Sequence, residues 1–135
     1  MKRTVVNPKS IPARNKPYSQ GIIVEARRFL FVAGQVPIDQ EGLTVGTGDV
    51  TAQCRQVFKN IEAVLKEAGA NFSNIAQFTT FLVDSQHMPA FYTARNELYR
   101  ELYPEGDYPT NTLLVIDRLA SEDFLLEIEA IAALD

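Results

Sequence analysis

Two acidic residues, Glu127 and Glu129, interrupt an otherwise apolar segment near the end of the chain, "FLLEIEAIAAL" (124–134). Residues two apart on a strand share a face, at a separation of about 6.6 Å. Carboxylates in an apolar strand are costly unless they are paired or hydrogen-bonded. Each acid could pair with an arginine across a subunit interface, and we favour this for Glu129. Alternatively, one acid holds a water beside a pocket for proton transfer.

Other chemistry is poorly represented. The chain has one cysteine and one histidine, so we expect no zinc site within one chain and no other metal site. Cys54 lies at a helical apolar position and is predicted to be a core residue, while His87 is predicted to lie at the surface or to cap a helix. The glycines at 42, 46 and 48 lack the order of a phosphate-binding loop and are predicted to form turns.

The composition describes a single soluble domain spanning residues 1–135. Apolar residues make up 46% and charged residues 22% of the chain. The net charge of −4 and the pI near 5.0 argue against a broad nucleic-acid surface, so a nucleic-acid partner is not expected. No segment has the length and apolarity of a signal peptide or a membrane-spanning helix. With a single cysteine as well, we expect a cytoplasmic protein without a membrane partner.

The apolar periodicity predicts an α+β domain with the order β-β-α-β-α-β-β. Strands are expected at "GIIVEA", "RFLFVAGQVP", "IAQFTTFLV", "TLLVIDRL" and "FLLEIEAIAAL", and the first two are expected to pair with each other. One helix is expected from Val50, with Asp49 as its N-cap and Gly69 as its C-terminal stop. A second is expected from near Pro89 to Pro104, and residues 1–17 are expected to form an extended surface segment.

Two helices can cover only one face of such a mixed sheet. The last strand nevertheless carries apolar side chains on both faces. The second face therefore needs a cover from outside the chain. A homo-oligomer that associates through the sheet is the economical explanation.

Six segments together resemble the RidA/YjgF family, in the order and at the spacing of that family. They are "KPYSQG", "FVAGQVP", "AQCRQVFKNIEAVLKEAG", "TTFLVD", "YPTNTLLVIDRL" and "EIEAIA". The resemblance covers almost the whole chain and implies a chorismate-mutase-like protomer in a homotrimer with an inner barrel of sheets. It also implies a small-molecule ligand in clefts between subunits and cofactor-free hydrolysis of imines or enamines, such as 2-aminoacrylate, to keto acids and ammonia.

The resemblance also implies roles for particular positions. The family's water-positioning glutamate falls on Glu127, and the tyrosine that borders the site falls on Tyr18. Backbone amides around Gly34 are candidate ligand donors. A serine that often lines the site is replaced by Ala33. The last two positions, 111 and 113, carry the largest changes.

The family's carboxylate-binding arginine is replaced by Asn111, and a cysteine two residues later is replaced by Leu113. An amide can donate two hydrogen bonds but supplies no charge. We therefore expect a poor 2-aminoacrylate deaminase that Asn111→Arg improves, unless another cation binds the carboxylate; Arg14 and Lys16 are the first candidates. The alternative, that Asn111 only serves the turn before its strand, stays open.

Several functions remain to be separated. The first is an imine or enamine hydrolase, or one acting on a related C–N bond, with Glu127 activating water. The second is a non-catalytic binding or regulatory trimer that uses the same clefts. Less favoured is a ribonuclease or translation inhibitor, as described for some family members, because the chain is acidic and lacks a basic aromatic patch. Ammonia release from imines would separate the first two.

Overall fold

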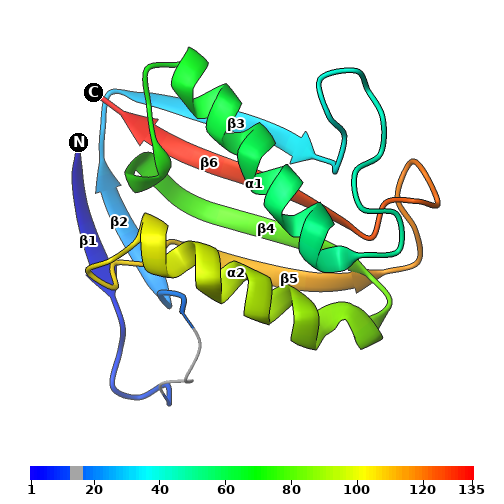
Figure 1. The fold of residues 1–135 in the computed structure, drawn as a ribbon. Coiled ribbons are helices and arrows are strands. Elements are labelled where there is room, and N and C mark those ends of the chain that lie inside the picture. Colours follow the sequence, from blue (N-terminus) through cyan, green and yellow to red (C-terminus); the bar gives the residue numbers. More distant parts are fainter. Residues whose placement is uncertain (13–16) are drawn as a thin grey trace.

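Two helices and a β-sheet form the body of the protein in the computed structural model, which describes residues 1–12 and 17–135 (Figure 1). The strands are β1 (Lys2–Val6), β2 (Gly21–Glu25), β3 (Arg28–Gln35), β4 (Ile75–Val83), β5 (Thr110–Ile116) and β6 (Leu126–Leu134). The helices are α1 (Val50–Glu67) and α2 (Met88–Leu102), with short 3₁₀ helices at Phe72–Asn74 and Ser85–His87. Among the described residues, no helix has the length and apolarity to cross a membrane.

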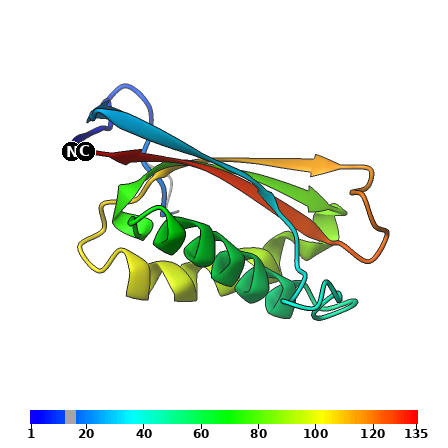
Figure 2. The same ribbon diagram turned by 90° about the horizontal axis from the view of Figure 1, so that it is seen from above.

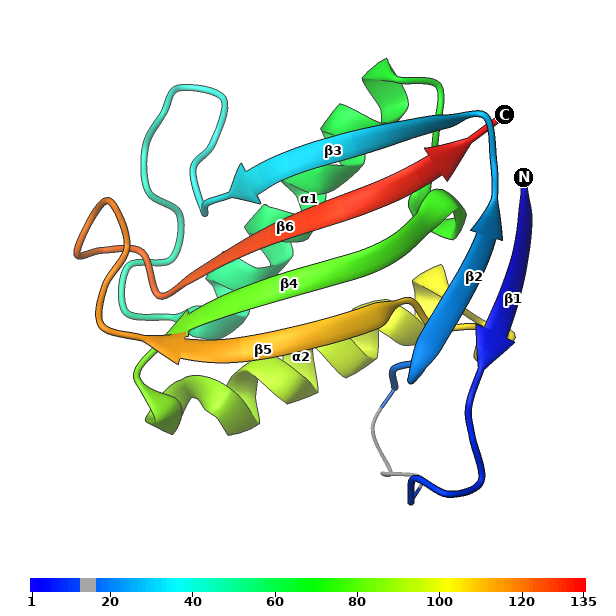
Figure 3. The ribbon, with the colours of Figure 1, turned by 180° about the vertical axis from the view of Figure 1, so that it is seen from behind.

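The main sheet has four strands in the order β3-β6-β4-β5 (Figure 3). β4 and β5 run parallel because α2 connects them, whereas β6 pairs antiparallel with both β3 and β4. Both helices pack against the same face of this sheet, and in Figure 2 no helix of the described residues lies over the other face. The predicted α+β class, with a mixed sheet and two helices on one face, is confirmed.

The N-terminal part differs from the sequence-based prediction in two ways. Residues 2–6 form a strand, because the run "TVV" suits β-structure and pairs with β2 from Lys2↔Glu25 to Val6↔Gly21. The predicted pairing between the second and third strands is wrong. No glycine-containing reverse turn separates β2 from β3, so the chain bends at residues 26–27. β3 then pairs with β6 instead, starting at Arg28↔Leu134.

The first helix follows its sequence signals closely. Asp49 caps the N-terminus by accepting a hydrogen bond from the Ala52 amide at 3.1 Å. Gly69 has a φ of 70° immediately after the helix, as a C-terminal stop requires. The apolar face packs on the sheet and is buried along its whole length, at Val50, Cys54, Val57, Phe58, Ile61 and Leu65. Apolar spacing and caps together were enough to predict α1.

The second half of the chain also follows the prediction, with changes at strand ends. α2 begins one residue before Pro89 and ends before Pro104, as expected. β4 has the predicted limits. β5 begins two residues earlier and ends three residues earlier than predicted, because its pairing with β4 spans Thr110 to Ile116 only. β6 begins two residues later than predicted, at Leu126.

The two faces of the sheet differ in exposure. On the helix side, Phe78, Leu82, Leu126 and Ile128 are buried in the core. On the open side, aromatic residues of β3 reach solvent, with Phe31 at 74% and Phe29 at 51% exposure. Monomeric soluble proteins rarely leave contiguous large apolar side chains on an open sheet face. The open face thus differs from the helix face by its exposed aromatic side chains.

Candidate functional site

The residues that the sequence points to lie on opposite faces of the sheet. Glu127 pairs in register with Phe81 of β4, whereas Asn111 pairs with Phe78 of β4. Residues paired across neighbouring strands share a face, and residues three apart on one strand do not. Phe78 is buried under the helices. Asn111 therefore faces the helices and Glu127 faces the open side.

Lateral distance adds to this separation. β4 lies between β5, which carries Asn111, and β6, which carries Glu127. Two strand spacings amount to about 10 Å. A small ligand cannot contact both side chains of one chain in this arrangement. The candidate site is consequently two groups of residues, one on each side of the sheet.

The first group, which we call the open-face group, consists of Ala33, Gly34 and Glu127. In β3 the register shifts between Val32, opposite Ala130, and Gln35, opposite Ile128, so residues 33 and 34 together oppose the single residue 129. This is a β-bulge, a common device beside functional sites. The bulge places the Gly34 backbone beside the Glu127 side chain.

Only glycine fits at position 34 without a change in its neighbour. A Cβ atom there would lie 2.7 Å from Cδ of Glu127 and 2.8 Å from its Cγ. Real Cβ contacts are longer, so any larger residue would displace the carboxylate. Glu127 is half-buried in this position, while Glu129, two residues away on the same face, is exposed. Within the described ranges, neither carboxylate forms an ion pair in its own chain.

The second group lines a pocket of about 330 Å³ between α2 and the edge strand β5, which we call the α2–β5 pocket. Its lining residues are Tyr18, Met88, Tyr92, Arg95, Asn111, Thr112 and Leu113. Three of the predicted site residues are therefore brought together here: Tyr18, Asn111 and Leu113. The volume is at the low end of the range for small-molecule sites.

Tyr18 reaches this pocket because the neighbouring residue is anchored to the start of β5. The Ser19 hydroxyl donates to the Tyr108 carbonyl at 2.6 Å, and the Ser19 amide donates to the Pro109 carbonyl at 3.3 Å. Ser19 is itself buried. Ser19 of the N-terminal segment thus meets the motif "YPTNT" through one side-chain and one backbone hydrogen bond. This contact explains why segments ninety residues apart share one pocket.

Asn111 has a defined orientation in the pocket. Its Oδ1 accepts a hydrogen bond of 2.9 Å from the hydroxyl of Thr80, a residue of β4 that is only 1% exposed. The interaction occupies the acceptor side of the amide and leaves the two N–H donors of Nδ2 for another partner. The bond to Thr80 holds the Asn111 amide within β5, facing the pocket.

Arg95 is the residue of this pocket that sequence reasoning missed. Its side chain is 2% exposed, and its guanidinium carbon lies 4.9 Å from the ring centre of Tyr92, 5.2 Å from that of Tyr99 and 5.6 Å from that of Phe91. Nη2 donates to the Asn96 side chain at 3.3 Å, and the buried Nε has no hydrogen-bond partner. Burial lowers the pKa of Arg95 below its usual value, but a guanidinium stays charged at neutral pH.

A sequence signal for Arg95 exists. Phe91, Arg95 and Tyr99 are spaced by four residues, so they lie on one face of α2. Phe91 and Tyr99 are both buried. An arginine between two buried aromatic residues at this spacing therefore lies on the buried face of the helix.

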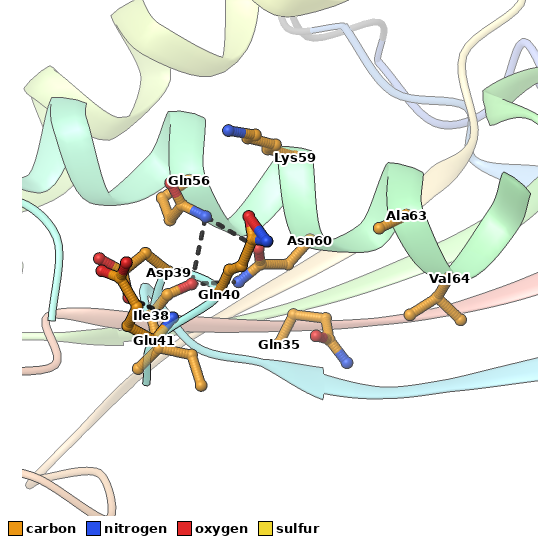
Figure 4. Close-up of a pocket in the computed structure, with 10 residues that line it drawn as sticks. All are labelled: Gln35, Ile38, Asp39, Gln40, Glu41, Gln56, Lys59, Asn60, Ala63 and Val64. Atoms are coloured by element: carbon orange, nitrogen blue, oxygen red, sulfur yellow. Dashed lines mark hydrogen bonds between the residues drawn. The ribbon is translucent and has the colours of Figure 1, made fainter. Parts of the chain in front are cut away.

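A larger pocket, of about 580 Å³, lies between α1 and the loop that follows β3. Figure 4 shows the Gln56 and Asn60 side chains pointing from α1 toward this loop. Both donate to the Ile38 carbonyl, at 3.1 and 2.9 Å, and Asn60 also donates to the Val36 carbonyl at 3.0 Å. These amides hold the loop against the helix. We assign this pocket a structural role.

Cys54, His87 and the three glycines of residues 42–48 lie outside both groups of site residues. Cys54 is fully buried in α1, and burial raises the pKa of its thiol to about 12, which makes it a core residue and not a nucleophile. His87 precedes α2 and makes no side-chain cap hydrogen bond. Gly42, Gly46 and Gly48 have φ near 75° and form turns as predicted. Arg14 and Lys16 lie outside the described residues.

Comparison with known proteins places the whole chain in one family. Residues 8–134 match the family described as Endoribonuclease L-PSP. A RutC family protein of Pyrococcus abyssi is 37% identical over 132 residues, which cover 98% of each chain. A mouse protein named 2-iminobutanoate/2-iminopropanoate deaminase is 34% identical, over 96% of this chain and 90% of that one.

A solved structure supports the same assignment. The Rid family protein YyfB of Yersinia pestis, described as of unknown function, superposes with a TM-score of 0.87 and is 33% identical. The match covers 99% of this chain and 100% of that protein. The fold and the arrangement of the strands are therefore shared along the full length.

Proposed function

The chain belongs to the Endoribonuclease L-PSP family, also called the RidA/YjgF family, and on this premise we propose that it hydrolyses a small imine or enamine. The observation that carries the proposal is the position of Glu127. Its half-buried carboxylate lies over Gly34, in a space that a larger residue would fill. A carboxylate held beside backbone, with no ion pair among the described residues, is suited to hold a water molecule. The deaminase name of the mouse relative agrees with this chemistry.

The proposed reaction needs only water and one carboxylate. Glu127 accepts a proton from water while the water oxygen bonds to the carbon of the protonated C=N group, which gives a neutral carbinolamine. The same carboxyl group then donates that proton to nitrogen. As the C–N bond breaks and ammonia leaves, the Glu127 carboxylate takes the hydroxyl proton and the carbonyl group forms. An enamine enters the reaction after it takes a proton on carbon and becomes a protonated imine.

We further propose that two copies of the chain build each site in a homotrimer. The sheet separates the open-face group from the α2–β5 pocket, so the two groups act on one ligand only when they come from different copies. The exposed Phe29 and Phe31 on the open face support association there. A cyclic trimer repeats one heterologous contact three times and would create three equal sites.

A second candidate function has its own observation. Ala33, Asn111 and Leu113 all depart from the residues that the active family pattern carries, and all three belong to the proposed site. A trimer with these changes could bind a metabolite without turning it over. The family description also names an endoribonuclease, but the net charge of −4 gives RNA no broad basic surface to bind.

Ammonia release tests the proposed activity. The substrates are 2-aminoacrylate, 2-iminobutanoate and a set of uncharged imines, each generated in the cuvette by a coupled enzyme. We expect ammonia above the buffer rate for at least one of them, and a mass by light scattering of about three times the 15.1 kDa chain. Binding without ammonia release from any substrate would favour the second candidate, and a monomeric mass would overturn the trimer.

A further inference from the structure

A positive charge without a carboxylate partner lies in the wall of the α2–β5 pocket. Among the described residues, Arg95 forms no ion pair. Apart from burial, the pKa of Arg95 is affected by the nearby side chains of Tyr99, Tyr92 and Cys54. Burial raises the pKa of Tyr99 and that of Cys54, so both of these groups are neutral at pH 7. Tyr99 and Cys54 therefore bring no negative charge to the guanidinium.

Such an arrangement is costly for a purely structural arginine. A buried ion is tolerated when a counter-ion and hydrogen bonds replace the water that it has lost. The three aromatic rings around Arg95 compensate part of this loss. The unpartnered Nε shows that the compensation is incomplete. An anion bound in the pocket would supply the rest.

The opposite wall offers matching donors. Asn111 keeps its acceptor oxygen on Thr80 and has two amide N–H groups left, which are donors that a carboxylate can accept. Met88 and Leu113 contribute apolar surface to the pocket, beside Tyr18, Tyr92 and Thr112. The pocket thus combines one cation, one pair of neutral donors and an apolar surface, in a volume that suits a short carbon chain.

We propose that Arg95 binds the carboxylate of a small α-imino or α-keto acid in the α2–β5 pocket, together with Asn111. The charge that an arginine of β5 would supply in the family pattern comes here from α2, across the pocket. The carboxylate class of the ligand follows from the pocket alone. Its imine form rests on the proposed function.

Binding measured without turnover tests this proposal. The probes are 2-oxobutanoate and its uncharged amide, 2-oxobutanamide, titrated calorimetrically into wild-type protein. We expect Arg95→Met, which keeps an apolar side chain of similar length, to weaken binding of the acid by roughly 10- to 100-fold and to change amide binding little. Arg100→Met is the matched control, because it removes the same charge from an exposed position of the same helix.

A purely structural Arg95 predicts a different result. Arg95→Met would then lower the melting temperature and weaken the acid and the amide alike, or neither. Equal affinity of wild-type protein for both probes would also overturn the proposal. So would the absence of acid binding up to a 2-oxobutanoate concentration of about 10 mM. Arg95→Lys should recover only part of the acid affinity, since a lysine lacks the planar fork of donors.

A measurement on the unaltered protein covers the case in which Arg95→Met does not fold. The Nε–H resonance of a buried arginine is observable by ¹⁵N NMR, and it should shift with saturation as 2-oxobutanoate is added. 2-Oxobutanamide should leave it in place, and an unmoved resonance at saturating acid contradicts the proposal. Because no readout involves ammonia, acid binding through Arg95 can stand even if the protein proves to have no hydrolase activity.

Discussion

The open-face group and the α2–β5 pocket differ in how their side chains are held in place. Glu127 lies on an inner strand of the sheet, and its carboxylate lies over Gly34, beside a bulge in the neighbouring strand. The pocket lies at the sheet edge, between a helix, an edge strand and the N-terminal segment. The inner group depends on the backbone. The edge group depends on side chains from three separate elements.

This difference determines what each region can tolerate. A side chain added at position 34 changes the position of the carboxylate itself, because its Cβ would lie 2.7 Å from Cδ of Glu127. In the pocket, a function lost on one element can be supplied from another. Asn111 on β5 and Arg95 on α2 illustrate such a transfer, in which the strand supplies neutral donors and the helix supplies the charge.

The largest effect is expected from Glu127→Gln. It preserves shape and removes the proton acceptor, so ammonia release should fall by roughly 10²- to 10⁴-fold. Binding of 2-oxobutanoate should change little, because the acid of the open-face group is not the carboxylate-binding part. Steady-state kinetics and calorimetry on the same preparation measure both. Retained turnover would remove Glu127 from the mechanism.

Mixing two inactive variants tests whether the groups meet between copies. Glu127→Gln lacks the acid, and Asn111→Asp places a negative charge where the ligand carboxylate binds. When the two are unfolded, mixed and refolded in equal amounts, about a quarter of the sites should combine an intact pocket with an intact acid. Ammonia release should recover to a similar fraction of wild type. No recovery, with trimers formed, would show that both groups belong to one chain.

Gly34→Ala should change the position of the Glu127 carboxylate with little effect on the stability of the protein. The added Cβ collides with the end of the Glu127 side chain, which can rotate away, so the backbone need not move. We expect activity to fall by roughly tenfold or more, while the free energy of unfolding changes by less than about 1 kcal/mol. Thermal unfolding and initial rates provide the measurement. A rate equal to wild type would show that the carboxylate position is not critical.

The position of the positive charge in the pocket can be moved by mutation from α2 to β5. Asn111→Arg alone would place a second guanidinium beside Arg95, so we expect a lower melting temperature and no large gain in 2-aminoacrylate turnover. In the Arg95→Met background the same substitution should raise the affinity for 2-oxobutanoate by about tenfold. The sequence alone predicted that Asn111→Arg improves turnover unless another cation binds the carboxylate. With Arg95 as that cation, little improvement is expected. Equal effects of Asn111→Arg in both backgrounds would show that the two positions are independent.

The smallest effect concerns alkaline pH and the helix side of the sheet. Burial raises the pKa of Cys54 to about 12, and it also raises the pKa values of Tyr99 and Tyr103. The pKa values of these groups are higher in the folded than in the unfolded protein. Their contribution to the free energy of unfolding is therefore complete below about pH 9 and is lost as the pH rises toward 12. For Cys54 the loss should be on the order of 1 kcal/mol at pH 10. Urea unfolding at pH 8 and pH 10 would measure it, with Cys54→Ala reducing the difference.

The sequence by itself determined the elements whose signals are local. α1 followed from apolar spacing with Asp49 and Gly69 at its ends, and α2 followed from Pro89 and Pro104. The resemblance of the motifs identified the family, Glu127 and Asn111, because short segments carry that information in order. Even the burial of Arg95 was encoded locally, in its spacing from Phe91 and Tyr99.

Only the tertiary structure decided how these elements face one another. The pairing of β1 with β2, and of β3 with β6, depends on contacts between residues far apart in the chain, which no local pattern specifies. The same holds for the site. A strand alternates between two faces, but which face the helices cover is settled by packing of the whole domain. That packing places Asn111 with Arg95 and separates both from Glu127 by the thickness of the sheet.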